Sequence, residues 1–220
     1  MAKVVPAKPL LIMLYGFPGA GKSYFARQLA ENIQAVHVQP ERLRAELFEN
    51  PRYDSQENAI ISQLSEYMMG EFLSAGVSVV YDVNAMRAAQ RHGLRDMARQ
   101  MHAQPLLVWF QIDPDSAYQR ASKRDRRRVD DRFAQPVTKE SFKDTVGRMQ
   151  NPSNTEDYVV VSGKHLFSTQ LSAIMKRLHE LKLISSDSLT NHVVKPGLVN
   201  LVPNPAAGRV DLSRRNIVIR

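Results

Sequence analysis

Cysteine is absent from this chain of 220 residues, and no apolar segment is long enough to cross a bilayer. The lack of cysteine excludes disulfides, thiolate metal sites and cysteine nucleophiles. A membrane-spanning helix needs roughly 18 consecutive apolar residues, whereas the apolar run at 10–15 has six and leads directly into a glycine loop. That run also lacks the cleavage site of a secretory leader. We therefore expect a cytoplasmic protein with no membrane partner.

Positively charged residues are in excess only in the second half of the chain. The formal net charge is +8, yet residues 1–112 carry 11 Lys or Arg against 10 Asp or Glu. The positive excess therefore lies after residue 112. Such a surface is suited to a nucleic acid or a phosphate-bearing substrate, although a solvated basic face explains it as well.

Apolar runs alternate with amphipathic segments along most of the chain. We expect strands over 10–15, 35–38, 77–83, 106–112 and 158–162, and helices over 22–33, 41–48, 55–75, 85–102, 138–149 and 167–181. A further helix is expected from Asp113, as N-cap, into the basic stretch 120–132. Five strands separated by helices predict an α/β protein with a parallel, doubly wound sheet. In the helix over 55–75, the residues expected to face inward are Ile60, Leu64, Tyr67, Met68 and Phe72.

The last part of the chain differs in composition from the rest. Pro196, Gly197, Pro203, Pro205 and Gly208 punctuate a basic, polar segment, which is typical of extended or turn-rich structure. We therefore expect one domain over 1–182 and a turn-rich tail over 183–220.

A phosphate-binding loop follows the first expected strand. The run 16–23 reads GFPGAGKS and matches G-x-x-x-x-G-K-[ST] without a mismatch. Glycines let backbone N–H groups surround a phosphate, and the N-terminus of the following helix adds partial positive charge. Lys22 is expected to contact the β- and γ-phosphates and Ser23 to bind Mg²⁺. The motif predicts a site for ATP or GTP, built from Gly16, Phe17, Pro18, Gly19, Ala20, Gly21, Lys22, Ser23 and Tyr24.

Two pairs of polar residues are expected beside this loop, because ligands bind at the carboxyl ends of parallel strands. Glu41 and Arg44 lie three apart in the short helix that follows the second strand. There a carboxylate can deprotonate a hydroxyl and an arginine can hold a phosphate, or the two can form a local ion pair. Asp82 ends the third strand and is expected to support Mg²⁺. Asn84 fits either the same site or the N-cap of the next helix.

The basic stretch offers three further candidates. If the helix continues through it, Arg120, Arg124 and Arg127 share one face and can stabilise the charge of a transferring phosphoryl group. The alternative is a solvated face neutralised by Asp125, Asp130 and Asp131.

Taken together, these residues resemble the P-loop kinases often labelled AAA-type ATPases of the zeta-toxin and polynucleotide-kinase kind. The matching features are GFPGAGKS at 16–23, Glu41 with Arg44, Asp82 with Asn84, and the arginine-rich segment from Arg120, spread over about residues 8–165. The resemblance implies a mobile lid over about 120–135 and Mg²⁺-assisted transfer of the γ-phosphoryl group of ATP to a hydroxyl. It implies Glu41 as acceptor base, where the family usually has Asp, and Arg44 as a ligand of acceptor phosphate. Arg120, Arg124 and Arg127 are the implied lid residues.

Two functions fit these observations. The first is a kinase that acts on a hydroxyl of a nucleic-acid 5′ end or of a small metabolite. The second is a nucleotide-dependent binding or regulatory ATPase whose basic half and tail contact a nucleic acid or a protein partner. The basic stretch has only Phe133 close by, so base stacking has little support.

Overall fold

A computed structural model describes residues 3–129 and 131–186, and the predicted tail lies almost wholly outside these residues. The strands are β1 (Leu10–Gly16), β2 (Ala35–Val38), β3 (Ser78–Asn84), β4 (Gln104–Gln111) and β5 (Tyr158–Ser162). The helices are α1 (Lys22–Asn32), α2 (Pro40–Leu47), α3 (Ser55–Ser74), α4 (Ala88–Gln100), α5 (Pro114–Ser122), α6 (Lys139–Gly147) and α7 (Phe167–Glu180). The five strands expected from the sequence are confirmed.

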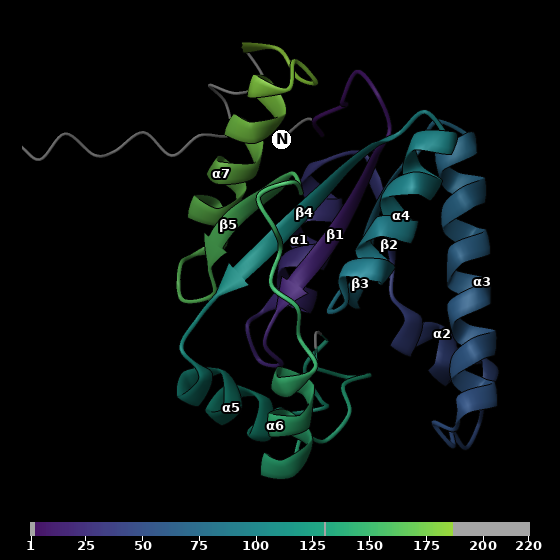
Figure 1. Cartoon of the computed structure of the whole chain (residues 1–220), viewed down its shortest axis with the longest axis vertical. Coiled ribbons are helices and arrows are strands. Elements are labelled where there is room, and N and C mark those ends of the chain that lie inside the picture. The colour runs from purple at the N-terminus through teal and green to yellow at the C-terminus, as the bar shows by residue number, and fades with distance from the viewer. Residues whose placement is uncertain (1–2, 130, 187–220) are drawn as a thin grey trace, which may run out of the picture.

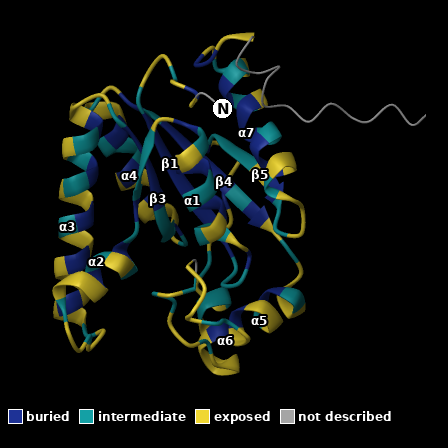
Figure 2. Ribbon diagram, turned by 180° about the vertical axis from the view of Figure 1, so that it is seen from behind, coloured by how far each residue is buried: buried dark blue, intermediate teal, exposed yellow. Residues whose placement is uncertain are grey.

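The strands form one parallel sheet in the order β2-β3-β1-β4-β5. Every residue of β1 is buried, as expected of a central strand with helices on both faces. Helices α1 and α7 cover one face, and α3 and α4 cover the other (Figure 1). The apolar side chains between each helical layer and the sheet make up two core clusters. The buried strands show as a dark centre between exposed helical surfaces in Figure 2.

The carboxyl ends of the strands all meet at one edge of the sheet. Helices α5 and α6 lie beyond this edge, at the bottom of Figure 1. The chain returns from α6 to β5 through residues 148–157. The connections that follow β1, β2 and β3 therefore face the same space, which is where the candidate site is found.

The buried face of α3 differs from the sequence prediction by one residue. Its buried residues are Glu57, Ile61, Ser65, Met69 and Leu73, whereas Ile60 and Tyr67 are exposed. Met69 and Leu73 on this face pack into the core cluster shared with β3 and α4, and Glu57, whose carboxylate is 1% exposed, is paired with Arg44 on α2. Because residues four apart share a helix face, the core contacts of Met69 and Leu73 and the ion pair of Glu57 all favour the same rotation of α3.

The packed part of the chain extends slightly beyond the expected boundary at residue 182. Leu183 and Ile184 belong to the core cluster under α1 and α7. The backbone of Leu183 also accepts a hydrogen bond from the N–H of Ala7 at 2.8 Å. The two ends of the described chain are thus joined at the edge of the sheet opposite to the strands' carboxyl ends (Figure 1).

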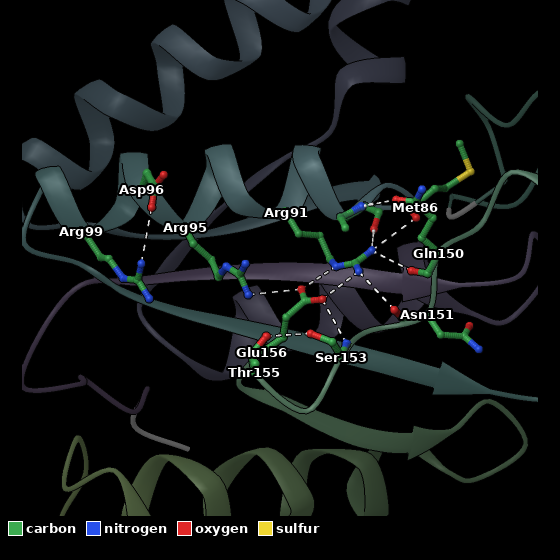
Figure 3. Close-up of polar contacts among 12 residues, drawn as sticks. Met86, Arg91, Arg95, Asp96, Arg99, Gln150, Asn151, Ser153, Thr155 and Glu156 are labelled. Atoms are coloured by element: carbon green, nitrogen blue, oxygen red, sulfur yellow. Dashed lines mark hydrogen bonds and ion pairs between the residues drawn. The ribbon is translucent and has the colours of Figure 1, made fainter.

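A fully buried arginine on α4 holds several segments together (Figure 3). Arg91 is 0% exposed, and its Nε and Nη2 atoms donate to the two carboxylate oxygens of Glu156 at 2.7 and 2.9 Å. Its Nη1 atom donates to the carbonyl oxygens of Ala85 and Gln150 at 2.9 and 3.0 Å. The guanidinium also lies 5.3 Å from the centre of the Tyr15 ring. Arg91 therefore ties the connection after β3 and the segment before β5 to the central strand.

Replacing Glu156 with Gln is expected to lower the free energy of unfolding by about 3 kcal/mol, because the charge of Arg91 would stay buried without a counterion. Hydrogen bonds from Arg91 lower the pKa of Glu156. The stability that the ion pair contributes is therefore fully present above the pKa of the carboxyl in the unfolded chain, about 4.3. It is lost as the pH falls through the lower pKa of Glu156 in the folded protein. Urea unfolding at pH 7 and pH 3 measures both effects.

The matched control is Asp157→Asn, which removes a partly exposed ion pair with Arg177. Such a pair contributes roughly 1 kcal/mol or less. Equal losses for the two variants at pH 7 would contradict a special role of the buried pair.

Candidate active site

The loop from Gly16 to Ser23 joins β1 to α1 and needs glycine at two positions. Gly21 is the N-cap of α1 with φ 92°, a left-handed conformation that favours glycine. At Gly19, φ is 85°, and an added Cβ would lie 2.1 Å from the carbonyl oxygen of Ala117 on α5. The loop therefore lies directly against α5, and a side chain at position 19 has no room.

Lys22 folds back over the loop. Its Nζ atom donates to the carbonyl oxygens of Gly16 and Phe17 at 2.8 and 2.9 Å. Burial lowers the pKa of Lys22 to about 7, while Asp82 acts in the opposite direction and Arg124 lowers it further. A bound phosphate would favour the charged form of the lysine, because opposite charges at short distance stabilise one another.

Ser23 and Asp82 form the oxygen-rich part of the site. Ser23 Oγ donates to Asp82 Oδ1 at 3.1 Å, and His37 Nε2 lies 3.2 Å from Asp82 Oδ2. The Asp82 side chain is 4% exposed. His37 was not singled out in the sequence; the register pairs it with Val80, two residues before Asp82, so only the strand pairing identifies it.

These oxygens fit the Mg²⁺ expected from the sequence. Mg²⁺ is usually held by one or two protein oxygens, with water and substrate phosphates completing its ligands. Among residues 3–129 and 131–186, no group of three or more His, Cys, Asp or Glu is arranged to hold a metal ion. A hydroxyl and a carboxylate beside a phosphate loop match an ion that is bound mainly through phosphate.

Asn84 supports the loop instead of capping a helix. Its Oδ1 atom accepts a hydrogen bond from the N–H of Gly16 at 3.2 Å. The pairing of β1 with β3 shifts after Met13, so that Leu14 pairs with Asn84. The N-cap alternative for Asn84 is wrong, because α4 begins at Ala88 with Arg87 as its N-cap.

Glu41 and Arg44 lie on α2 but in different surroundings. Glu41 lines the cavity in front of the phosphate loop. Arg44 is buried and does not line it; its Nη1 atom pairs with Glu57 Oε1, and its Nη2 atom donates to Asn58 Oδ1 at 2.8 Å. Glu41 Oε2 lies 3.4 Å from Arg44 Nε, and neither atom has a hydrogen-bond partner among the described residues. The structure therefore places Arg44 behind Glu41 and not at an acceptor phosphate.

The three candidate arginines of the basic stretch do not share a helix face, because α5 ends at Ser122. The carboxylate of Asp125 accepts a hydrogen bond from the N–H of Arg127 at 3.0 Å, a local turn that competes with helix. Arg120 donates to the carbonyl oxygen of Gly163 at 2.7 Å. Arg127 is 91% exposed and paired with Asp125.

Arg124 is the one of these three whose charge acts on Lys22, lowering the pKa of that lysine. Its Nε atom is 3.7 Å from Asp131 Oδ1. Burial lowers the pKa of Arg124, and Asp131 and Asp82 oppose that effect. Asp130, the remaining acid expected to neutralise the stretch, lies outside the described residues.

One cavity of about 1000 Å³ brings most of the candidates together. The residues predicted from the sequence that line it are Pro18, Gly19, Gly21, Lys22, Ser23, Tyr24, Glu41, Asp82, Asn84, Arg120 and Arg124. Gly16, Phe17, Ala20, Arg44 and Arg127 do not line it. Its lining also includes residues that the sequence analysis did not assign, among them Gln39, Met86, Lys123, Arg128 and Phe133. Lys123, Arg128 and Phe133 fall within the expected lid over 120–135, whereas no motif marks Gln39 and Met86, and only the fold places those two here.

Comparisons with known proteins agree with this architecture. The model of a family described as AAA domain matches residues 11–152, which is more than half of the chain. No match was found among curated proteins. Among the described residues, no helix is sufficiently long and apolar to cross a membrane.

Solved structures with low sequence identity share the fold. A gluconokinase from Sinorhizobium meliloti 1021 has a TM-score of 0.56 and 15% identity, covering 79% of this chain and 93% of that chain. Chaetomium thermophilum Kti12 in complex with ADP-AlF3 has a TM-score of 0.59 and 15% identity, covering 80% and 100%. The APS kinase CysC of Mycobacterium tuberculosis, in complex with AMPPNP and APS, has a TM-score of 0.53 and 17% identity, covering 80% and 99%. The resemblance inferred from the motifs is thus confirmed: the chain belongs to the AAA domain family and has a P-loop kinase fold.

Proposed function

We propose that this protein is an ATP-dependent phosphotransferase that moves the γ-phosphoryl group to a hydroxyl of an acceptor. The observation that carries the proposal is the single cavity in which the phosphate loop, Asp82 and Glu41 face one another. A kinase needs phosphate-binding groups and an acceptor base within reach of the same space. Of the three similar structures described above, two are kinases by name. The third, Kti12, is in complex with ADP-AlF3.

Each residue of the proposed site has a separate role. Lys22 and the loop N–H groups bind the β- and γ-phosphates, and Arg124 contributes positive charge at the transferring group. Ser23 and Asp82 would hold Mg²⁺, which neutralises phosphate charge when bound. Glu41 accepts the proton of the acceptor hydroxyl. The arginine segment 120–135 is proposed as the lid, whereas the expected tail, apart from Leu183 and Ile184 in the core, lies mostly outside the described residues.

The proposal is tested by transfer of label from γ-labelled ATP in the presence of Mg²⁺. The acceptor panel contains 5′-hydroxyl oligonucleotides, nucleosides, nucleotide sugars and sugars. Labelled product is expected in one acceptor class and not with Lys22→Ala, because the variant lacks the charge that holds the phosphates. Circular dichroism checks that the variant stays folded. Label that remains in ATP or free phosphate throughout the panel would contradict kinase function.

Replacing Glu41 with Gln is expected to lower the rate of transfer by about 10²–10⁴-fold, because the amide cannot accept the acceptor proton. The affinity for ATP should stay within a few-fold, since Glu41 is not part of the phosphate loop. Single-turnover kinetics and titration with an ATP analogue separate the two effects. Unchanged transfer would exclude Glu41 as the base.

A nucleotide-dependent binding protein is the second candidate function. It is favoured by the exposure of the arginine segment, where Arg127 is 91% exposed and outside the cavity. This function requires binding of a polyanion that depends on both nucleotide and salt, with no phosphorylated product.

A further inference from the structure

The cavity is divided into two walls of opposite charge. The wall formed by the phosphate loop, α5 and the arginine segment has one acid, Asp131, and five cations: Lys22, Arg120, Lys123, Arg124 and Arg128. The other wall is formed by the connections that follow β2 and β3. Its lining residues are Gln39, Glu41, Asp82, Asn84 and Met86. Among the described lining residues, this second wall has two carboxylates and no lysine or arginine.

Arg44 is the cation in contact with Glu41, and it does not reach the cavity. Its guanidinium is bound to the Glu57 carboxylate and to the Asn58 amide, and its flat face lies 4.6 Å from the centre of the Tyr53 ring. Glu57 is 1% exposed. If Arg44 turned toward a bound acceptor, the carboxylate of Glu57 would remain in the interior without its ion pair, which is strongly unfavourable.

We propose that the acceptor is an uncharged small molecule with several hydroxyl groups, such as a neutral sugar, a polyol or a nucleoside. An anionic group placed at this wall would meet no lysine or arginine among the described lining residues and would be repelled by the carboxylate of Glu41. A neutral hydroxyl instead donates to the Glu41 carboxylate: its Oε2 atom is buried against Arg44 Nε, but the side chain as a whole is 34% exposed and lines the cavity. The Gln39 amide supplies both a donor and an acceptor for further hydroxyls.

This inference rests on the proposed kinase function. In the reaction, the acceptor hydroxyl oxygen forms a bond to the γ-phosphorus, and the bond from that phosphorus to the β–γ bridging oxygen breaks. ADP leaves with the bridging oxygen, and the hydroxyl proton passes to the Glu41 carboxylate. No other reactant is needed.

The test compares neutral and anionic members of matched acceptor pairs, with γ-labelled ATP and the full chain. The pairs are glucose and gluconate, ribose and ribose 5-phosphate, and adenosine and adenosine 3′-phosphate; a 5′-hydroxyl oligonucleotide completes the panel. For the pair that is phosphorylated, kcat/KM is expected to be at least about 10-fold higher for the neutral member. Preference for the anionic member, or for the oligonucleotide, would overturn the inference but leave the kinase function intact. Release of phosphate with no labelled acceptor would overturn both.

A charge-adding variant tests the same wall directly. Met86→Arg places a cation on it, and we expect kcat/KM for the anionic member to rise by about 10-fold relative to the neutral one. The control is Gln90→Arg, which adds the same charge at an exposed position of α4 outside the cavity lining. This variant should leave the ratio of kcat/KM for the anionic member to kcat/KM for the neutral member unchanged. Equal ratios for the two variants would show that this wall does not contact the acceptor.

Discussion

The guanidinium of Arg91 is the constraint on which the arrangement of the site depends. A buried charge of this kind is tolerated only when its hydrogen bonds are satisfied, and the partners come from segments far apart in sequence: Ala85 after β3, and Gln150 and Glu156 before β5. The hydrogen bonds of the Arg91 side chain therefore fix the course of two connections, the one after β3 and the one before β5 (Figure 3). The connection after β3 begins beside Asn84 and carries Met86, and both residues line the cavity. The buried hydrogen bonds of Arg91 therefore determine where this part of the cavity wall lies.

Position in the fold, more than residue type, decides what each arginine does here. Arg44 and Arg91 are buried, and each is paired with a carboxylate from another segment. Both of them support the wall that carries Glu41 and Met86. Arg124 has a carboxylate at 3.7 Å and lines the cavity, which leaves its charge close to Lys22. Burial and the distance to the nearest acid thus separate the arginines that support the cavity wall from Arg124, which lines the cavity.

The sequence predicts those parts of the site that depend on neighbours along the chain. The phosphate loop is a contiguous motif, and Asp82 follows from the rule that parallel strands end at the same edge, so both could be predicted. The inward face of α3, the turn after Ser122 and the partners of Arg44 depend on contacts between segments. Glu57 can face inward on α3 because Arg44 on α2 supplies its ion-pair partner. Asn84 binds the loop only because the pairing of β1 and β3 shifts by two residues, which periodicity does not reveal.

The close approach of Gly19 to α5 also has a mechanical consequence. There is no space for a methyl group between the loop and the Ala117 carbonyl, so a movement of the loop toward α5 would have to displace the helix. Helix α5 has nine residues and is therefore about 13 Å long. It leads directly into the arginine segment. The phosphate loop and the arginine residues that line the cavity are thus joined through one short helix.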